Sequence, residues 1–202
     1  MGYNSHMSRF IQHGLLFAIA ALVIGMDQVS KYLVRVNLQF VSSFAPIPAL
    51  ADFFTIINTQ NTGAAFGMFK EAGGIFTVVA ILVSGAIVFY YHRIPEGQYL
   101  IRIALGLQLG GALGNLIDRL LYGTVTDFIF FHWYDQLNAP IFNIADLSIT
   151  IGVIILAYLM LLEHLEERRA AIRADAATAS SASPTSATHD LAHHFDHRRS
   201  GR

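Results

Sequence analysis

Four long apolar stretches alternate with shorter, more polar segments along this chain. They cover about residues 14–36, 74–91, 99–121 and 144–162. Each contains about the 20 mostly apolar residues that a helix needs to cross a bilayer. The pattern therefore predicts four transmembrane helices.

The polar segments after the first and third stretches have a pattern of their own. Residues 52–59 and 125–131 are rich in Phe, Thr, Ile and Val, which is typical of β-strands. Asn61 and Gly63 follow the first candidate strand and indicate a turn. We therefore predict a mainly α membrane protein with four transmembrane helices and a small extracytoplasmic β-sheet, built from about residues 37–72 and 122–143.

Composition supports a membrane protein. Hydrophobic residues make up 54% of the 202 residues and charged residues 13%, with a mean hydropathy of +0.49. The charged fraction is about half of the roughly 25% that is usual in soluble domains. A net charge of −1 gives no electrostatic basis for binding nucleic acid. The absence of cysteine excludes disulfides, a cysteine nucleophile and thiolate metal ligands.

The two ends of the chain are set apart from the predicted membrane domain, residues 7–165. Residues 1–6 resemble a cloning remnant ahead of a native start at Met7 and are left out of the fold prediction. Residues 166–202 are charged, then rich in Ala, Ser and Thr, then rich in His and Arg, which predicts a disordered cytoplasmic tail. No metal site is assigned to the tail histidines.

Basic residues in short loops predict the orientation of the helices. Arg9, Arg93 and Arg168 lie beside helix ends that would share one side of the membrane. By the positive-inside rule, both termini and the loop around Pro95 are then cytoplasmic. Polar residues from distant parts of the chain consequently meet near the outer surface. They are Asp27, Lys31, Asn115, Asp118, Arg119, Asp127, Asn143 and Asp146.

Two of these residues, Asp127 and Asp146, flank a short outer loop and are candidates for peptide hydrolysis. Ionisable residues in membrane segments are costly and are functional candidates by default. When two carboxylates share one proton, the ionised one can accept a proton from water while the other donates to a carbonyl. Asn143 is a candidate N-cap, which would place Asp146 in a first helical turn that favours negative charge. We therefore expect Asp146 to hold the charge more readily and Asp127 to carry the shared proton.

The other polar residues leave alternatives open. Asp118 is expected in a structural ion pair or a hydrogen bond to substrate. Asp27 and Lys31, four residues apart on one helix face, form either an interfacial ion pair or a brace for the site. Asn61 and Asn115 would either bind an extended substrate backbone or cap turns. Separately, glycines at positions 106, 110 and 114 indicate close helix packing.

Two other functions compete with a peptidase. A proton channel or transporter would spread its acids through the depth of the membrane, whereas here they gather at one end. A metal-dependent lipid phosphotransferase would use its acids to hold Mg²⁺ and would be sensitive to chelators. The spacing of Asp118, Asp127 and Asp146 lacks a compact acidic motif for such a metal. No metal or cofactor is therefore assigned.

Five sequence blocks resemble bacterial lipoprotein signal peptidase (signal peptidase II), a family of membrane aspartic peptidases. The blocks are Asp27-Gln28-x-x-Lys31, Asn61-x-Gly63-Ala64-Ala65-Phe66, Gly114-Asn115-Leu116-Ile117-Asp118-Arg119, Val125-x-Asp127-Phe128 and Phe142-Asn143-x-Ala145-Asp146. Thr126, Gln60 and Leu147 depart from the usual pattern but do not touch the two acids.

The resemblance implies a metal-free, four-helix inner-membrane protein with a periplasmic β-cradle. It implies a catalytic pair at Asp127 and Asp146, in a chain expected to be monomeric. The implied reaction removes the signal peptide of a prolipoprotein, on the N-terminal side of a diacylglyceryl-modified cysteine, next to membrane lipid. The residues implied to shape the site or bind substrate are Asp27, Lys31, Asn61, Gly63, Asn115, Asp118, Arg119 and Asn143.

Overall fold

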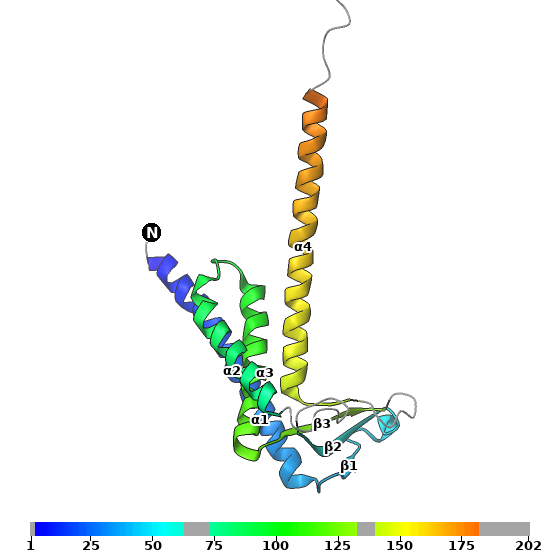
Figure 1. The fold of residues 1–202 in the computed structure, drawn as a ribbon. Helices are drawn as coiled ribbons and strands as arrows, with labels where there is room; N and C mark the ends of the chain where they lie inside the picture. The colour runs from blue at the N-terminus through cyan, green and yellow to red at the C-terminus, as the bar shows by residue number, and fades with distance from the viewer. Residues whose placement is uncertain (1–2, 63–72, 133–139, 182–202) are drawn as a thin grey trace, which may run out of the picture. The chain divides into compact units, whose positions relative to one another are not determined.

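The computed structural model describes residues 3–62, 73–132 and 140–181. Figure 1 shows the long helices and the small sheet. The helices are α1 Tyr3–Asn37, α2 Gly73–Tyr90, α3 Tyr99–Tyr122 and α4 Ile144–Ser181, and the strands are β1 Ser43–Phe44, β2 Phe54–Asn61, β3 Val125–Phe131 and β4 Ile141–Phe142. Short 3-10 helices cover Pro48–Leu50 and Tyr91–Arg93. Residues 1–157 form one compact unit, and residues 158–202 form a second that is described separately.

The helices confirm the prediction of four membrane spans. Segments of sufficient length and hydropathy are Gly14–Asn37, Gly74–Arg93, Tyr99–Tyr122 and Ile144–Ala176. Large apolar side chains such as Leu22, Ile75 and Ile154 remain more than half exposed on their outer faces. A helix that is apolar on its exposed face as well as its packed face is suited to contact with lipid.

Helices α1 and α3 approach each other closely at the glycines of α3. A Cβ atom on Gly106 would lie 2.7 Å from the backbone oxygen of Leu16, and one on Gly110 would lie 2.7 Å from Cβ of Val23. Any larger residue would force these helices apart, so the predicted role of the glycines in helix packing is confirmed. Beside this contact, a small apolar core brings together Leu16, Ala20, Ile87 and Leu109.

The sheet is antiparallel with strand order β1-β2-β3-β4. The predicted strand at 125–131 is β3, and the one at 52–59 is β2, shifted by two residues. Between Ile56 and Thr59 the pairing of β2 with β3 changes register, after which Thr59 lies opposite Asp127 and Asn61 opposite Val125. Asn61 and Asp127 are therefore diagonal neighbours across the two strands, close enough for their side chains to meet.

The region after residue 165 differs from the expected disordered tail. Within the second unit, α4 continues to Ser181, so residues 166–181 are helical. Their Glu, Arg and Ala residues are strong helix formers, and this local preference favours helix over disorder. The tail histidines lie outside the described residues. At the other end, α1 begins at Tyr3 and so includes part of the predicted cloning remnant.

Candidate active site

The site is built around the first turn of α4. The side chain of Asn143 accepts a hydrogen bond from the backbone N–H of Asp146 at 2.9 Å, and the Asp146 carboxylate accepts one from the N–H of Asn143 at 3.3 Å. These reciprocal bonds form a capping box, with aspartate at the third helical position. The predicted N-cap is thus confirmed, and Asp146 lies in the first turn, where the helix dipole favours its charge.

Asp127 reaches the same place from β3. Its carboxylate accepts hydrogen bonds from Nδ2 of Asn143 at 2.6 Å and from Nδ2 of Asn61 at 2.9 Å. Only 3% of Asp127 is exposed. Asn143 therefore contacts both carboxylates, one through its side-chain amide and the other through its backbone N–H. Two acids from separate elements of the chain are brought to opposite sides of one asparagine.

Burial and a neighbouring charge change the acidity of Asp127. Burial raises the pKa of its carboxyl from 3.8 to about 7, and the charge of Asp146 acts in the same direction. The hydrogen bonds from Asn61 and Asn143 oppose this rise, as does the positive charge of Lys31. A carboxyl with a pKa near neutrality exchanges its proton readily under physiological conditions, as general acid–base chemistry requires.

A buried ion cluster lies behind these acids. Lys31 is fully buried; its Nζ lies 2.8 Å from Asp27 and 3.5 Å from Asp118. Asp27 also accepts a hydrogen bond from the backbone N–H of Ala145 at 2.9 Å, so a side chain of α1 satisfies the first turn of α4. A Cβ atom on Gly114 would lie 2.6 Å from the Asp27 carboxylate, so this glycine makes room for it.

Asn115 connects the ion cluster to the acids. Its Oδ1 accepts hydrogen bonds from Lys31 at 2.9 Å and from Asn143 at 3.1 Å, and its Nδ2 donates to Asp146 at 2.8 Å. This amide is 6% exposed. Asn115 is therefore an internal partner of the acids, and not a cap of a turn.

Asp118 lies in an ion pair, one of the two alternatives left open for it. Its neighbours are Lys31 and, at 3.6 Å, Arg35, while one of its oxygens accepts the N–H of Thr126 at 2.9 Å. Arg35 also donates to the hydroxyl of Thr126 at 2.9 Å. Sequence reasoning missed Arg35, although its spacing of four residues from Lys31 places both on one face of α1.

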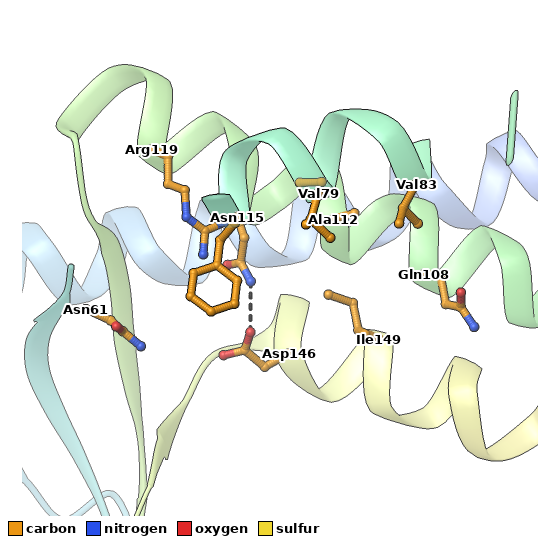
Figure 2. A pocket seen from close by; sticks show the side chains of 11 residues that line it. Asn61, Val79, Val83, Gln108, Ala112, Asn115, Arg119, Asp146 and Ile149 are labelled. Atoms are coloured by element: carbon orange, nitrogen blue, oxygen red, sulfur yellow. Dashed lines mark hydrogen bonds between the residues drawn. The ribbon is translucent and has the colours of Figure 1, made fainter. Parts of the chain in front are cut away.

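A largely apolar cavity of about 420 Å³ opens beside Asp146. In Figure 2, Asn61, Arg119, Asn115 and Asp146 surround one end of it and Gln108 lies at the other. The guanidinium of Arg119 is 5.8 Å from the ring centroid of Phe76, a cation–π distance. The remaining lining comes from α2, α3 and α4 and consists of Phe76, Val79, Ala80, Val83, Ala112 and Ile149.

The structure thus brings together the candidate residues that it describes. Gly63 lies outside the described residues. Among residues 3–62, 73–132 and 140–181, no group of three or more His, Cys, Asp or Glu side chains could hold a metal ion. Sequence reasoning did not predict the cavity, because its lining depends on how three apolar helices are rotated about their axes.

Comparisons with known proteins agree on one family. The model of the family described as Signal peptidase (SPase) II matches residues 19–162. The lipoprotein signal peptidase of Moorella thermoacetica is 42% identical over 151 residues, covering 75% of this chain and 95% of the relative. That of Bacillus subtilis is 41% identical over 155 residues, covering 77% and 98%.

Solved structures of bacterial membrane enzymes have the same fold. One is 36% identical with a TM-score of 0.67, covering 75% of this chain and 90% of that one. Another is 37% identical with a TM-score of 0.64, covering 73% and 93%. Because the family model matches residues 19–162 and both relatives are more than 40% identical, this chain belongs to the signal peptidase II family.

Proposed function

We propose that this protein is a membrane aspartic endopeptidase that removes signal peptides from prolipoproteins. It cleaves on the N-terminal side of a diacylglyceryl-modified cysteine, at the outer face of the inner membrane, with both termini in the cytoplasm. One observation carries the proposal. The buried carboxylate of Asp127 and the half-buried carboxylate of Asp146 share Asn143 as a hydrogen-bond partner, and Asp146 lines an apolar cavity between membrane helices.

The pair supplies both functions that peptide hydrolysis needs. Ionised Asp146 takes a proton from a water molecule, and the water oxygen bonds to the scissile carbonyl carbon. Protonated Asp127 gives its proton to the carbonyl oxygen, which yields a neutral tetrahedral gem-diol. The carbonyl then re-forms as Asp127 recovers a proton from one hydroxyl. The C–N bond breaks while Asp146 protonates the leaving nitrogen, and the pair returns to its starting state.

The surroundings of the acids support this division of work. Asp146 receives hydrogen bonds from Asn115 and from the backbone of Asn143, and lies at a helix N-terminus, all of which stabilise the ionised form. Asp127 is the more enclosed partner, and burial raises its pKa to about 7. One protonated and one ionised carboxyl is therefore the favoured state near neutral pH.

The cavity suits a substrate that is itself embedded in the membrane. Its lining is apolar except near Arg119, Asn61, Asn115 and Asp146 at one end and Gln108 at the other. A signal peptide and its attached lipid both partition into the bilayer and would present apolar groups to this lining. Arg119 and Asn61 provide donors beside the acids for the carbonyl oxygens of the extended segment around the scissile bond.

A cleavage assay on a lipidated prolipoprotein tests the proposal. Wild type should convert the substrate to a shorter product on a gel, and it should leave the unlipidated precursor uncut. Asp127→Asn and Asp146→Asn should each lower the rate by at least about 1,000-fold, since each removes one of the two proton-transfer groups. Asp52→Asn, at an exposed aspartate just before β2, is the matched control and should retain activity.

The same assay separates the aspartic mechanism from a metal-dependent one. Added EDTA should leave the wild-type rate unchanged. Loss of activity with EDTA, restored by a divalent cation, would contradict the aspartic mechanism, as would substantial turnover by Asp127→Asn or Asp146→Asn.

A further inference from the structure

Lys31 has hydrogen-bonding properties that restrict its neighbours. An ammonium group has three donors and no acceptor. Lys31 is fully buried, so its donors must be satisfied within the protein. They face carboxylate oxygens of Asp27 and Asp118 and the amide oxygen of Asn115 at 2.9 Å. The group that meets Lys31 on Asn115 must therefore be its oxygen.

This requirement fixes the orientation of the Asn115 amide. With Oδ1 against Lys31, Nδ2 points to Asp146 and donates to its Oδ1 at 2.8 Å. The reversed amide would set NH₂ against an ammonium and an oxygen against a carboxylate. Two attractive contacts would become two repulsive ones in a low-dielectric interior. Lys31 thus orients the Asn115 amide so that its NH₂ group donates to Asp146.

A second series of hydrogen bonds fixes the orientation of the Asn143 amide. The backbone N–H of Asp146 is a donor and faces Oδ1 of Asn143 at 2.9 Å, so Nδ2 of Asn143 must point away from it. That Nδ2 donates to Oδ1 of Asp127 at 2.6 Å and to Oδ1 of Asn115 at 3.1 Å. Both series of hydrogen bonds meet at the oxygen of Asn115, so the orientations of the Asn115 and Asn143 amides reinforce each other.

All four carboxylate oxygens of the pair accept a hydrogen bond from an amide. Oδ1 of Asp127 faces Nδ2 of Asn143 and its Oδ2 faces Nδ2 of Asn61. Oδ1 of Asp146 faces Nδ2 of Asn115 and its Oδ2 faces the backbone N–H of Asn143. These donors stabilise the ionised form of each acid, and the bond from Asn115 is the one that Lys31 orients.

We infer that Lys31 is a positioning residue: through the oxygen of Asn115 it orients the amide that donates to Asp146, and so stabilises the ionised form of that acid. The inference rests on the proposed function and deepens it, because it assigns a role to the ion cluster behind the acids. Lys31 need not touch substrate for this role.

Other charged groups lie beside Lys31 or beside the acid pair. They are Asp27 and Arg35 on α1, and Asp118 and Arg119 on α3, in addition to Asp127 on β3 and Asp146 on α4. Helix α2 and strand β2 contribute no charged side chain. A test must therefore change the donor at position 31 while it leaves the total charge constant.

Two double variants achieve this. Asp27→Asn/Lys31→Gln and Asp27→Asn/Lys31→Met each remove one positive and one negative charge, so no buried charge loses its only partner. In both, residue 27 keeps an oxygen for the N–H of Ala145. Gln and Met have similar length and volume, but only Gln offers a donor to Asn115. The two double variants therefore have similar packing at position 31 and differ in whether that side chain can donate a hydrogen bond to Asn115.

The expected results follow from that donor. The Gln double variant should keep kcat within about threefold of wild type. The Met double variant should lose roughly 10- to 100-fold in kcat, the worth of a hydrogen bond to a charged group, with KM little changed. Its pH–rate profile should also have the acid limb moved to higher pH, because the ionised pair has lost a directed donor. Equal kcat values and superimposable profiles for the two double variants would overturn the inference.

Asn115→Asp provides a second test that keeps the ion cluster intact, in case the Met double variant fails to fold. The new carboxylate retains an oxygen for Lys31 but sets a second oxygen against Asp146. Activity should fall at neutral pH and recover in part at lower pH, where a protonated carboxyl regains a donor. A profile of wild-type shape, merely scaled down, would contradict the inference.

The controls Asp127→Asn and Asp146→Asn separate this inference from the proposed function. If both are inactive while the two double variants behave alike, the peptidase mechanism stands and the role of Lys31 falls. If either control is active, the mechanism itself falls.

Discussion

Replacing Asp127 with asparagine tests the energetics of the buried member of the acid pair. Burial raises the pKa of this carboxyl from 3.8 to about 7. The folded protein therefore binds a proton at Asp127 over a pH range in which the unfolded chain has released it. A shift of about three pH units at ~1.4 kcal/mol per unit corresponds to about 4 kcal/mol.

The sign follows from this linkage. Below pH 4 the carboxyl is neutral in both folded and unfolded chains, and its stabilising contribution is fully present. As the pH rises from about 4 to about 7, the unfolded chain ionises first, and the contribution of Asp127 is lost. The amide introduced by Asp127→Asn cannot ionise, so the variant escapes this loss. The stability of Asp127→Asn relative to wild type should therefore grow by up to about 4 kcal/mol between pH 4 and pH 8.

Thermal unfolding of the purified proteins in detergent, followed across this pH range, measures the effect. The introduced amide also sets an NH₂ group against a donor, either Asn61 or Asn143, which adds a constant offset. The test is therefore the slope of the stability difference with pH, to which ionisable groups that do not interact with Asp127 make no contribution. A difference that is independent of pH, or that shrinks as the pH rises, would refute the reasoning.

Asp146→Asn extends the same measurement. It removes the second cause of the raised pKa of Asp127 and leaves the first, which is burial. The pH-dependent loss of stability attributed to Asp127 should thus occur at lower pH, but still above pH 4. If this loss occurs at the same pH in Asp146→Asn, the two acids do not interact.

Three further changes probe the frame of the site. Gly114→Ala should displace the Asp27 carboxylate, destabilise the fold by about 1–3 kcal/mol and lower kcat, whereas Gly85→Ala, whose Cβ would meet nothing within 4 Å, should be neutral or slightly stabilising in thermal unfolding. Asn143→Ser should keep a cap on α4 but lose the 2.6 Å bond to Asp127, so kcat should fall roughly tenfold or more while the helix is retained by circular dichroism. Ala112→Leu should fill part of the cavity and raise KM for the lipidated substrate about tenfold, whereas Ala86→Leu, on an exposed face of α2, should leave KM unchanged.

The sequence predicts the coarse arrangement because two strong physical signals are local. Apolar runs of about 20 residues define the spans, and the polar residues at their ends share a depth whatever the details of packing. Asn143 also predicts the start of α4, since a side chain that caps a helix acts only on its own first turn. These signals alone predict that the candidate residues lie together at one end of the helices, as the described residues do.

The partners within that group depend on helix rotation and strand register, which the sequence does not encode locally. Asp118 lies beside Arg119 in sequence, yet its ion pairs are with Lys31 and Arg35 on α1. The close approach of α1 to α3 over the glycines decides this choice. Similarly, the contact of Asn61 with Asp127 depends on the change of register in β2, which no short motif announces.

The ion cluster also bears on why a membrane protein keeps charges where they are costly. Asp27, Lys31 and Asp118 are fully buried, and two of them interrupt the apolar face of a spanning helix. Buried ion pairs contribute little to stability on balance, because desolvation offsets their attraction, and apolar residues of similar volume often serve as well. An apolar replacement, however, has no donor with which to turn the Asn115 amide toward Asp146. Stability alone therefore does not account for the cluster, whereas directed hydrogen bonding at the acid pair does.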